Sequence, residues 1–271
     1  MNPLPYIIVN DTSLYYQVQG QGVPIMFIHP PLLTSENFDY QAAQLSNRFQ
    51  VITFDIRGHG SSDRSFEPVT YPLIVQDMLK LMDGLNIKQA YVCGYSTGGG
   101  VALHALLTAP ERFLGGILVS GMSEASDLYL RLRMTTAIAL SRSKLKSLLR
   151  LAITWGNADN LKTFRTLYRS SQPGTSDNWY EYYRYSLDYS CTDQLQQIQA
   201  PVLLVYGKKD KSFHRYAWKL QQHLQNSKLI WIPEAKHQIP TKNAIMLNDC
   251  IESWITDKET RAEKIDTTIY E

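Results

Sequence analysis

Short apolar runs alternate with helix-patterned segments along most of this chain, and that alternation limits the folds open to it. Eight runs are rich in β-branched and aromatic residues: YIIV (6–9), LYYQV (14–18), IMFIH (25–29), QVITF (50–54), AYVCGY (90–95), GILVSG (116–121), VLLVY (202–206) and KLIWI (228–232). Several are apolar throughout, as strands covered on both faces require. The spacing between them predicts helices at about 37–46, 71–85, 98–109, 213–225 and 240–256. We therefore expect an α/β fold, with a mainly parallel sheet covered by helices on both faces and an antiparallel start from the first two runs.

The alternation stops between residues 123 and 195, where the spacing is helical and no strand is evident. Because this segment lies between two expected strands, we predict a helical cap (residues 123–195) inserted into a core of residues 1–122 and 196–271. The first part of the cap, 128–155, carries six Lys and Arg residues among apolar ones. A membrane-surface helix would show this pattern, but so does any surface helix, and we favour a solvated basic face. The tyrosine-rich stretch NWYEYYRYSLDY (178–189) either lines a pocket or packs the cap.

Composition excludes several classes of function. With 271 residues, of which 44% are hydrophobic, the chain can bury a full core. A net charge of +2 is too small to indicate a nucleic-acid partner. The start of the chain shows no secretion signal, no run approaches the ~20 apolar residues of a membrane span, and the tail after about 256 is polar and expected to be peripheral. The three cysteines lack metal or disulfide spacing, so we expect reduced packing residues in a cytoplasmic protein.

The segment AYVCGYSTGGGVALHALL contains the pattern GxSxG, from Gly94 to Gly98, between an expected strand and an expected helix. A serine on such a turn, here Ser96, is held in a strained conformation with its hydroxyl exposed above the sheet. The free N–H groups at the start of the helix point toward the same place. A glycine-rich turn that merely allows close packing would share the pattern, but its position at a strand–helix junction favours a nucleophile.

Serine is a poor nucleophile at neutral pH and needs a base. His104 falls within the helix after Ser96, which carries its side chain away from the turn, and His214 and His223 fall in a later helix. His237 follows the last expected strand and lies in a loop at the carboxyl edge of the sheet. We therefore predict that His237 is the base.

The base in turn needs a carboxylate to orient it. Asp210 lies in the loop after the preceding strand, and the chain order Ser96, Asp210, His237 is the one found with a GxSxG serine in an α/β sheet. Glu124 and Asp127, which follow the run GILVSG, are the alternative acids. We predict a triad of Ser96, His237 and Asp210.

Over about residues 5–255 the chain resembles the α/β-hydrolase family. The resemblance rests on GYSTGG, on FDIRGHGSSD (54–63), and on VYGKKD and AKH around the acid and the base. Among members, the pattern with its helical cap is similar to small esterases and cofactor-free perhydrolases, which implies that neither a metal nor an organic cofactor is needed. The resemblance gives the loop containing His59 a structural role. Ser96 excludes relatives that use an aspartate nucleophile.

The stretch FIHPPLLTSENFDYQ (27–41) departs from the family pattern. In the family the equivalent strand ends in His-Gly, and the next residue donates a backbone N–H to the oxyanion hole. Here those positions are Pro30 and Pro31, and proline has no N–H to donate. Thr97 N–H should remain as one donor, and losing the other typically costs about 10²- to 10³-fold in turnover. Three alternatives follow: the loop is reshaped, the protein is a weak hydrolase, or the pocket has a different use. We favour a reshaped loop in which Leu32 N–H is the second donor to the oxyanion.

The sequence thus predicts a serine hydrolase that cleaves a carboxylic ester or a related small acyl compound through an acyl-enzyme. Thioesters, lactones, amides, peracid formation and carbon–carbon cleavage are open to the same triad. The alternative is a hydrolase-like signalling or ligand-sensing protein. Pro31 supports this alternative because it cannot donate an N–H to an oxyanion. A third interpretation, an interfacial lipase, rests only on the basic cap helix.

Overall fold

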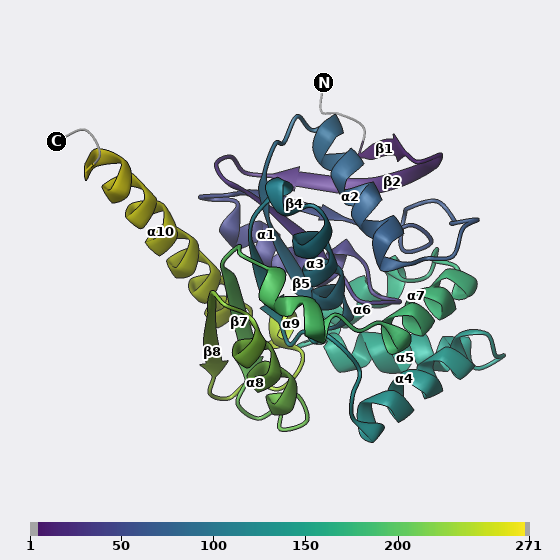
Figure 1. The fold of residues 1–271 in the computed structure, drawn as a ribbon. Helices are drawn as coiled ribbons and strands as arrows, with labels where there is room; N and C mark the ends of the chain where they lie inside the picture. The colour runs from purple at the N-terminus through teal and green to yellow at the C-terminus, as the bar shows by residue number, and fades with distance from the viewer. Residues whose placement is uncertain (1–4, 269–271) are drawn as a thin grey trace.

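One sheet runs through the centre of the molecule (Figure 1). The computed structural model describes residues 5–268, with side chains described up to residue 257. Within that range eight strands form the sheet, in the order β1-β2-β4-β3-β5-β6-β7-β8. The strands are β1 (Tyr6–Val9), β2 (Thr12–Gln19), β3 (Pro24–Ile28), β4 (Gln50–Phe54), β5 (Ala90–Tyr95), β6 (Phe113–Val119), β7 (Val202–Gly207) and β8 (Ser227–Ile232).

Strand direction follows the prediction. β1 pairs with β2, and β2 pairs with β4, in antiparallel fashion. The remaining pairings, from β4–β3 across the sheet to β7–β8, are parallel. Parallel strands bring their carboxyl ends to one edge of the sheet, so the loops that follow β3, β5, β7 and β8 gather there. The expected α/β fold is confirmed.

Alternate strand residues feed two separate cores, because successive side chains in a strand point to opposite faces. In β3, Met26 and Ile28 belong to one buried cluster, while Ile25 and Phe27 belong to the other. The first cluster includes side chains of α2 (Tyr71–Gly84), α3 (Thr97–Thr108) and α8 (His214–His223). The second includes side chains of α1 (Asp39–Leu45) and α10 (Ala244–Thr268). The sheet is therefore covered on both faces, which explains why its central strands are apolar throughout.

The last helical segment differs from the prediction of one helix at 240–256. It is divided into α9 (Ile239–Lys242) and α10, with Asn243 between them. The backbone of α10 continues to Thr268, beyond the position at which its apolar pattern ends. The outer part of α10 leads away from the sheet in Figure 1. The polar residues after about 256 therefore mark where α10 stops packing against the sheet, and the helix itself continues.

Four helices lie between β6 and β7, grouped on one side of the sheet in Figure 1: α4 (Leu128–Ser141), α5 (Lys146–Asn157), α6 (Leu161–Ser170) and α7 (Ser176–Asp188). Short 3-10 turns lie at η1 (Ser35–Phe38), η2 (Pro110–Arg112) and η3 (Thr192–Gln197). A single bridge between Glu124 and Ser190 links the two ends of the inserted segment. Among the described helices, none is both long and apolar enough to span a bilayer. The helical character predicted for the cap is present, and its limits at 123 and 195 stay a prediction.

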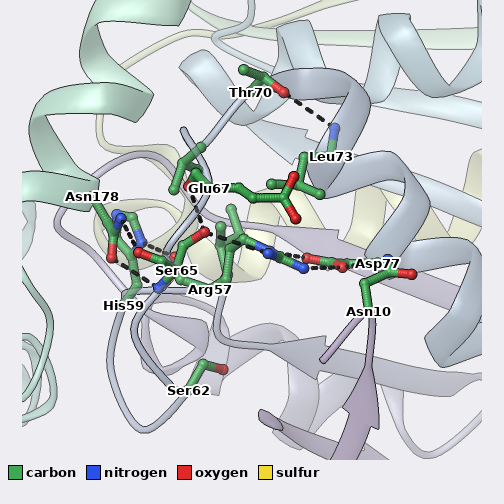
Figure 2. Close-up of polar contacts among 12 residues, drawn as sticks. Asn10, Arg57, His59, Ser62, Ser65, Glu67, Thr70, Leu73, Asp77 and Asn178 are labelled. Atoms are coloured by element: carbon green, nitrogen blue, oxygen red, sulfur yellow. Dashed lines mark hydrogen bonds and ion pairs between the residues drawn. The ribbon is translucent and has the colours of Figure 1, made fainter. Parts of the chain in front are cut away.

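The loop after β4 ties the core to the cap (Figure 2). Arg57 forms a bidentate ion pair with Asp77 of α2, at 2.6 and 2.7 Å, and both side chains are almost fully buried. On the other side of the loop, Asn178 of α7 accepts a hydrogen bond from Ser65 N–H and donates one to the Ser65 carbonyl, each at 3.1 Å. A Cβ at Gly58 would lie 2.1 Å from the Asn178 side chain, so this close contact requires glycine. These contacts fit the structural role expected for the loop.

Candidate active site

Ser96 lies at the junction of β5 and α3 in a backbone conformation that L-residues rarely adopt, with φ 55° and ψ −119°. Its N–H donates a hydrogen bond of 2.9 Å to the Val119 carbonyl on the neighbouring strand. A Cβ at Gly94 would lie 2.2 Å from the Gly98 carbonyl oxygen, and a Cβ at Gly98 would lie 2.4 Å from that of Ile28. Both glycines of the GxSxG pattern are therefore needed for the tight turn that presents Ser96.

In the predicted triad, His237 lies within hydrogen-bond distance of both Ser96 and Asp210. His237 Nε2 is 3.0 Å from Ser96 Oγ, and His237 Nδ1 is 2.9 Å from Asp210 Oδ2. Since the carboxylate can only accept, Nδ1 carries the proton and Nε2 accepts from the serine hydroxyl. Asp210 and His237 come from the loops after β7 and β8, at the same edge of the sheet as Ser96. Residues 141 positions apart in the chain are thus brought into one hydrogen-bonded row.

Neighbouring groups hold the acid and the base in place. Asp210 Oδ1 accepts a hydrogen bond of 2.8 Å from Ser212 Oγ. Burial acts to raise the pKa of Asp210, but the hydrogen bonds from His237 and Ser212 and nearby positive charge outweigh it and hold that pKa below its ordinary value. The His237 ring packs 4.2 Å from the Phe213 ring, centroid to centroid, and its carbonyl accepts from Ser120 Oγ at 3.1 Å. Asp210 is therefore an ionised acceptor at neutral pH beside a fixed imidazole.

The alternative acids are engaged elsewhere. Glu124 forms an ion pair with Lys219 of α8. Asp127 precedes α4 and accepts a hydrogen bond of 2.9 Å from Leu130 N–H, as a helix N-cap does. Both carboxylates stabilise the start of the cap, and Asp210 is the acid that reaches His237.

The histidines that were set aside lie away from the triad, as expected. His104 is within α3, where Nδ1 is 3.2 Å from the Tyr189 hydroxyl. His214 and His223 are both in α8, and His214 Nε2 is 3.1 Å from the Lys208 carbonyl. Their neighbours provide ordinary hydrogen-bond partners.

His29 organises the proline-containing loop after β3. Ile56 N–H donates to His29 Nε2 at 2.9 Å, which leaves Nδ1 as the protonated nitrogen, and Nδ1 is 2.9 Å from the Pro30 carbonyl. Burial lowers the pKa of His29 to about 4, so the ring is neutral at physiological pH. The histidine therefore serves as a fixed link between two loops.

Two tyrosines of α7 hold the same loop from the cap side. Tyr182 OH donates to the His29 carbonyl at 3.1 Å, and Tyr183 OH donates to the Pro31 carbonyl at 3.4 Å. Together with the bond to Pro30, three successive carbonyls of this loop accept hydrogen bonds. A loop with two prolines has lost two N–H groups, and it is positioned through its carbonyls instead. From the sequence these tyrosines either lined a pocket or packed the cap; Tyr183 does line the cavity, and the hydroxyl contacts with the loop were not predicted.

Leu32 follows Pro31 in a turn, with φ 72° and a fully buried side chain. A proline followed by a residue of positive φ is typical of a type II turn, in which glycine or asparagine normally occupies the second place. Leu32 is thus held in a conformation unusual for leucine. Pro30, Pro31 and Leu33 line the cavity described below. The donation of Leu32 N–H to an oxyanion stays a prediction.

A cavity of about 470 Å³ lies between the core and the cap, with Ser96, Thr97 and His237 in its wall. The cap contributes mainly apolar side chains from α4 and α5, among them Leu130, Met134, Leu149 and Ile153. Arg133 of α4 also lines this space and is the single Lys, Arg, Asp or Glu among the described lining residues. The sequence did not predict that Arg133 lines the cavity, because nothing in the pattern of α4 distinguishes Arg133 from the other basic residues.

Comparisons with known proteins agree with this architecture. A family model described as alpha/beta hydrolase fold matches residues 23–243. Serine hydrolase BPHL from Mus musculus is 28% identical over 267 residues, covering 92% of this chain and 85% of the relative. The pimeloyl-(acyl-carrier protein) methyl ester esterase of Nitrosomonas europaea is 26% identical, covering 83% and 92% of the two chains. The crystal structure of the enol-lactonase from Burkholderia xenovorans has a TM-score of 0.83 at 19% identity and covers 93% and 100% of the two chains.

Proposed function

This chain belongs to the alpha/beta-hydrolase family, and on that basis we propose that it is a serine hydrolase acting on a carboxylic ester or a related acyl compound. The observation that carries the proposal is the hydrogen-bonded row Ser96, His237, Asp210, with Ser96 in the wall of an apolar cavity. Two of the relatives described above, the serine hydrolase and the methyl ester esterase, support the same class of reaction by their names.

Acylation would begin at Ser96. His237 Nε2 takes the hydroxyl proton as Ser96 Oγ attacks the carbonyl carbon, and the Asp210 carboxylate stabilises the imidazolium that forms. The tetrahedral intermediate places its negative oxygen near the start of α3, where Thr97 N–H has no acceptor within the helix. His237 then gives the proton to the leaving alcohol, and the acyl group stays on Ser96.

Deacylation reverses the roles. A water molecule gives a proton to His237 and attacks the acyl carbon, and Ser96 leaves with that proton restored. The second oxyanion donor in both steps is Leu32 N–H, in our proposal, because Pro31 has none. The apolar side chains of α4 and α5 would hold the acyl part of the substrate.

The direct test is the hydrolysis of short p-nitrophenyl esters by the wild type, Ser96→Ala and Asp210→Asn. Ser96→Ala should lower kcat by about 10⁶-fold, and Asp210→Asn by about 10⁴-fold. Circular dichroism shows whether each variant is folded. Ester hydrolysis that survives Ser96→Ala in a folded protein would place the reaction elsewhere.

Pro31 supports a second candidate, a ligand-sensing protein that uses the same cavity without efficient turnover. The two candidates differ in what Ser96→Ala removes. A hydrolase loses turnover, whereas a sensor keeps the rise in Tm that its ligand produces in the wild type. Measuring both quantities on one preparation of the variant separates them.

A further inference from the structure

Arg133 brings an unbalanced positive charge to the wall of the catalytic cavity. It lies on α4 between Leu132 and Met134, which also line the cavity, as does Leu149 of α5. Within the described lining no Asp or Glu is present to balance it. Arg133 is itself exposed, so its charge is solvated in the free protein and stays accessible to a ligand that enters the cavity.

The acids near the cap already have partners. Residues 128–157 contain six Lys and Arg and no Asp or Glu. Asp127 and Asp159, on either side of this stretch, accept from the hydroxyls of Tyr216 and Tyr40, and Asp177 pairs with Arg142 at 3.0 Å. The contact described for Arg133 is with the Tyr129 ring, 5.6 Å from the guanidinium carbon. Among the described residues the Arg133 guanidinium takes part in no side-chain hydrogen bond or ion pair, so its donors are available to an anion.

The charge of Arg133 is felt at the triad. Burial acts to raise the pKa of Asp210, the hydrogen bond from His237 is the main influence that lowers it, and Arg133 adds a smaller lowering effect. Arg133 likewise opposes the rise that burial produces in the pKa of Tyr183, which also lines the cavity. Its positive field thus extends through the space in which a substrate would lie.

We propose that the cavity accepts an ester whose acyl part ends in a carboxylate, and that Arg133 binds this carboxylate while the ester carbonyl lies at Ser96. A guanidinium presents donors in a planar fork that matches a carboxylate. The apolar side chains between the two ends suit a methylene chain. This inference rests on the proposed function, because it names the substrate class of the same cavity.

The test compares methyl hemiesters of straight-chain dicarboxylic acids with the corresponding dimethyl esters, in which a neutral methyl ester replaces the remote carboxylate and rates are counted per ester group. Wild type should favour the hemiester. Arg133→Gln should lower kcat/KM for the hemiester about 10-fold, mainly through KM, and change the dimethyl ester less than about 2-fold. Arg133→Lys should keep part of the preference, since a lysine retains the charge without the fork. Lys146→Gln is the matched control, because Lys146 is an exposed cation of α5 outside the cavity lining.

A second measurement does not depend on turnover. In the Ser96→Ala background, calorimetry of hemiester binding should give a Kd about 10-fold weaker after Arg133→Gln and unchanged after Lys146→Gln. Three results would overturn the inference. They are equal hydrolysis of both esters by the wild type, equal slowing of both esters by Arg133→Gln, and a Kd for the hemiester that Arg133→Gln does not change. Failure of the proposed function has a different signature, namely no hydrolysis of either ester and no reaction of Ser96 with a fluorophosphonate.

Discussion

At the scale of single residues, the site depends on backbone conformations that are unfavourable for the residues present. Ser96 and Leu32 both have positive φ, at 55° and 72°, and neither is glycine. Such conformations persist only where surrounding structure enforces them, and they concentrate at functional sites. For Ser96 the enforcing structure is the pair of glycines Gly94 and Gly98, whose lack of Cβ admits neighbouring carbonyls.

The proposed role of Leu32 can be tested by removing one N–H. Replacing Leu32 with its α-hydroxy acid keeps the side chain and exchanges the amide for an ester. We expect kcat to fall about 10²- to 10³-fold with little change in KM, because the lost donor acts on the transition state. The same exchange at Leu33 is the matched control. Equal losses at both positions would mean that Leu32 N–H has no special place in the oxyanion hole.

A second residue-scale prediction concerns His59, whose pKa burial lowers to about 3 with help from the neighbouring His29. Below about pH 6.5 the unfolded chain binds a proton at this histidine and the folded chain does not, so acid favours unfolding. The resulting loss is about 1.4 kcal/mol per pH unit for this one group. Urea unfolding of wild type and His59→Asn from pH 7 to about pH 4 should show a shallower fall for the variant, because asparagine does not titrate.

The difference between the two proteins isolates His59. Burial raises the pKa of Asp55, which acts in the opposite direction, but Asp55 titrates in both proteins. Parallel stability curves for the two proteins would show that His59 is protonated in the folded state.

At the scale of elements, the loop after β4 is fixed by the buried pair Arg57 and Asp77 (Figure 2). Burial raises the pKa of Asp77, and the hydrogen bonds and charge of Arg57 oppose that rise. Asn10, from the turn after β1, donates a further hydrogen bond of 2.9 Å to Asp77. One ion pair thus connects the first hairpin, the loop after β4 and helix α2.

Breaking this pair on one side should destabilise the protein strongly. Asp77→Leu leaves the Arg57 charge buried without its partner, and we expect the free energy of unfolding to fall by about 3–5 kcal/mol. Arg57→Met/Asp77→Leu should lose less than the sum of the single variants, since no unpaired charge remains. The exposed pair Arg48 and Glu252, at 2.7 Å, is the control, and Arg48→Met should cost less than about 1 kcal/mol in the same urea experiment. Similar losses for Asp77→Leu and Arg48→Met would contradict this account.

The elements themselves were predictable where the pattern was unambiguous. The bounds expected for QVITF and AYVCGY are those of β4 and β5, because short runs rich in β-branched and aromatic residues between turns leave little choice. The order of the loops that hold Ser96, Asp210 and His237 was also readable, since each follows an apolar run. The hydroxyl contacts of Tyr182 and Tyr183 were not, because in sequence they are two among many tyrosines and only the docking of α7 gives them partners.

At the scale of the whole molecule, the cavity exists because the cap lies over the carboxyl edge of the sheet. The sequence predicted the insertion, but the position of Arg133 in the cavity wall depends on how α4 rotates against the core. The first part of the cap was expected to present a solvated basic face. It also exposes large apolar side chains, including Leu128, Leu132 and Trp155, which are 83%, 62% and 63% exposed. The lipase interpretation predicts faster hydrolysis when anionic vesicles are added, and unchanged rates would exclude it.

The central claim is that Ser96 is a working nucleophile despite Pro31. Its most direct test is intact-mass measurement after treatment with a fluorophosphonate. The probe reacts where a serine, its base and oxyanion donors are assembled together. We expect one adduct on the wild type and none on Ser96→Ala. A folded wild type that takes up no probe, or an adduct that persists in the variant, would contradict the claim.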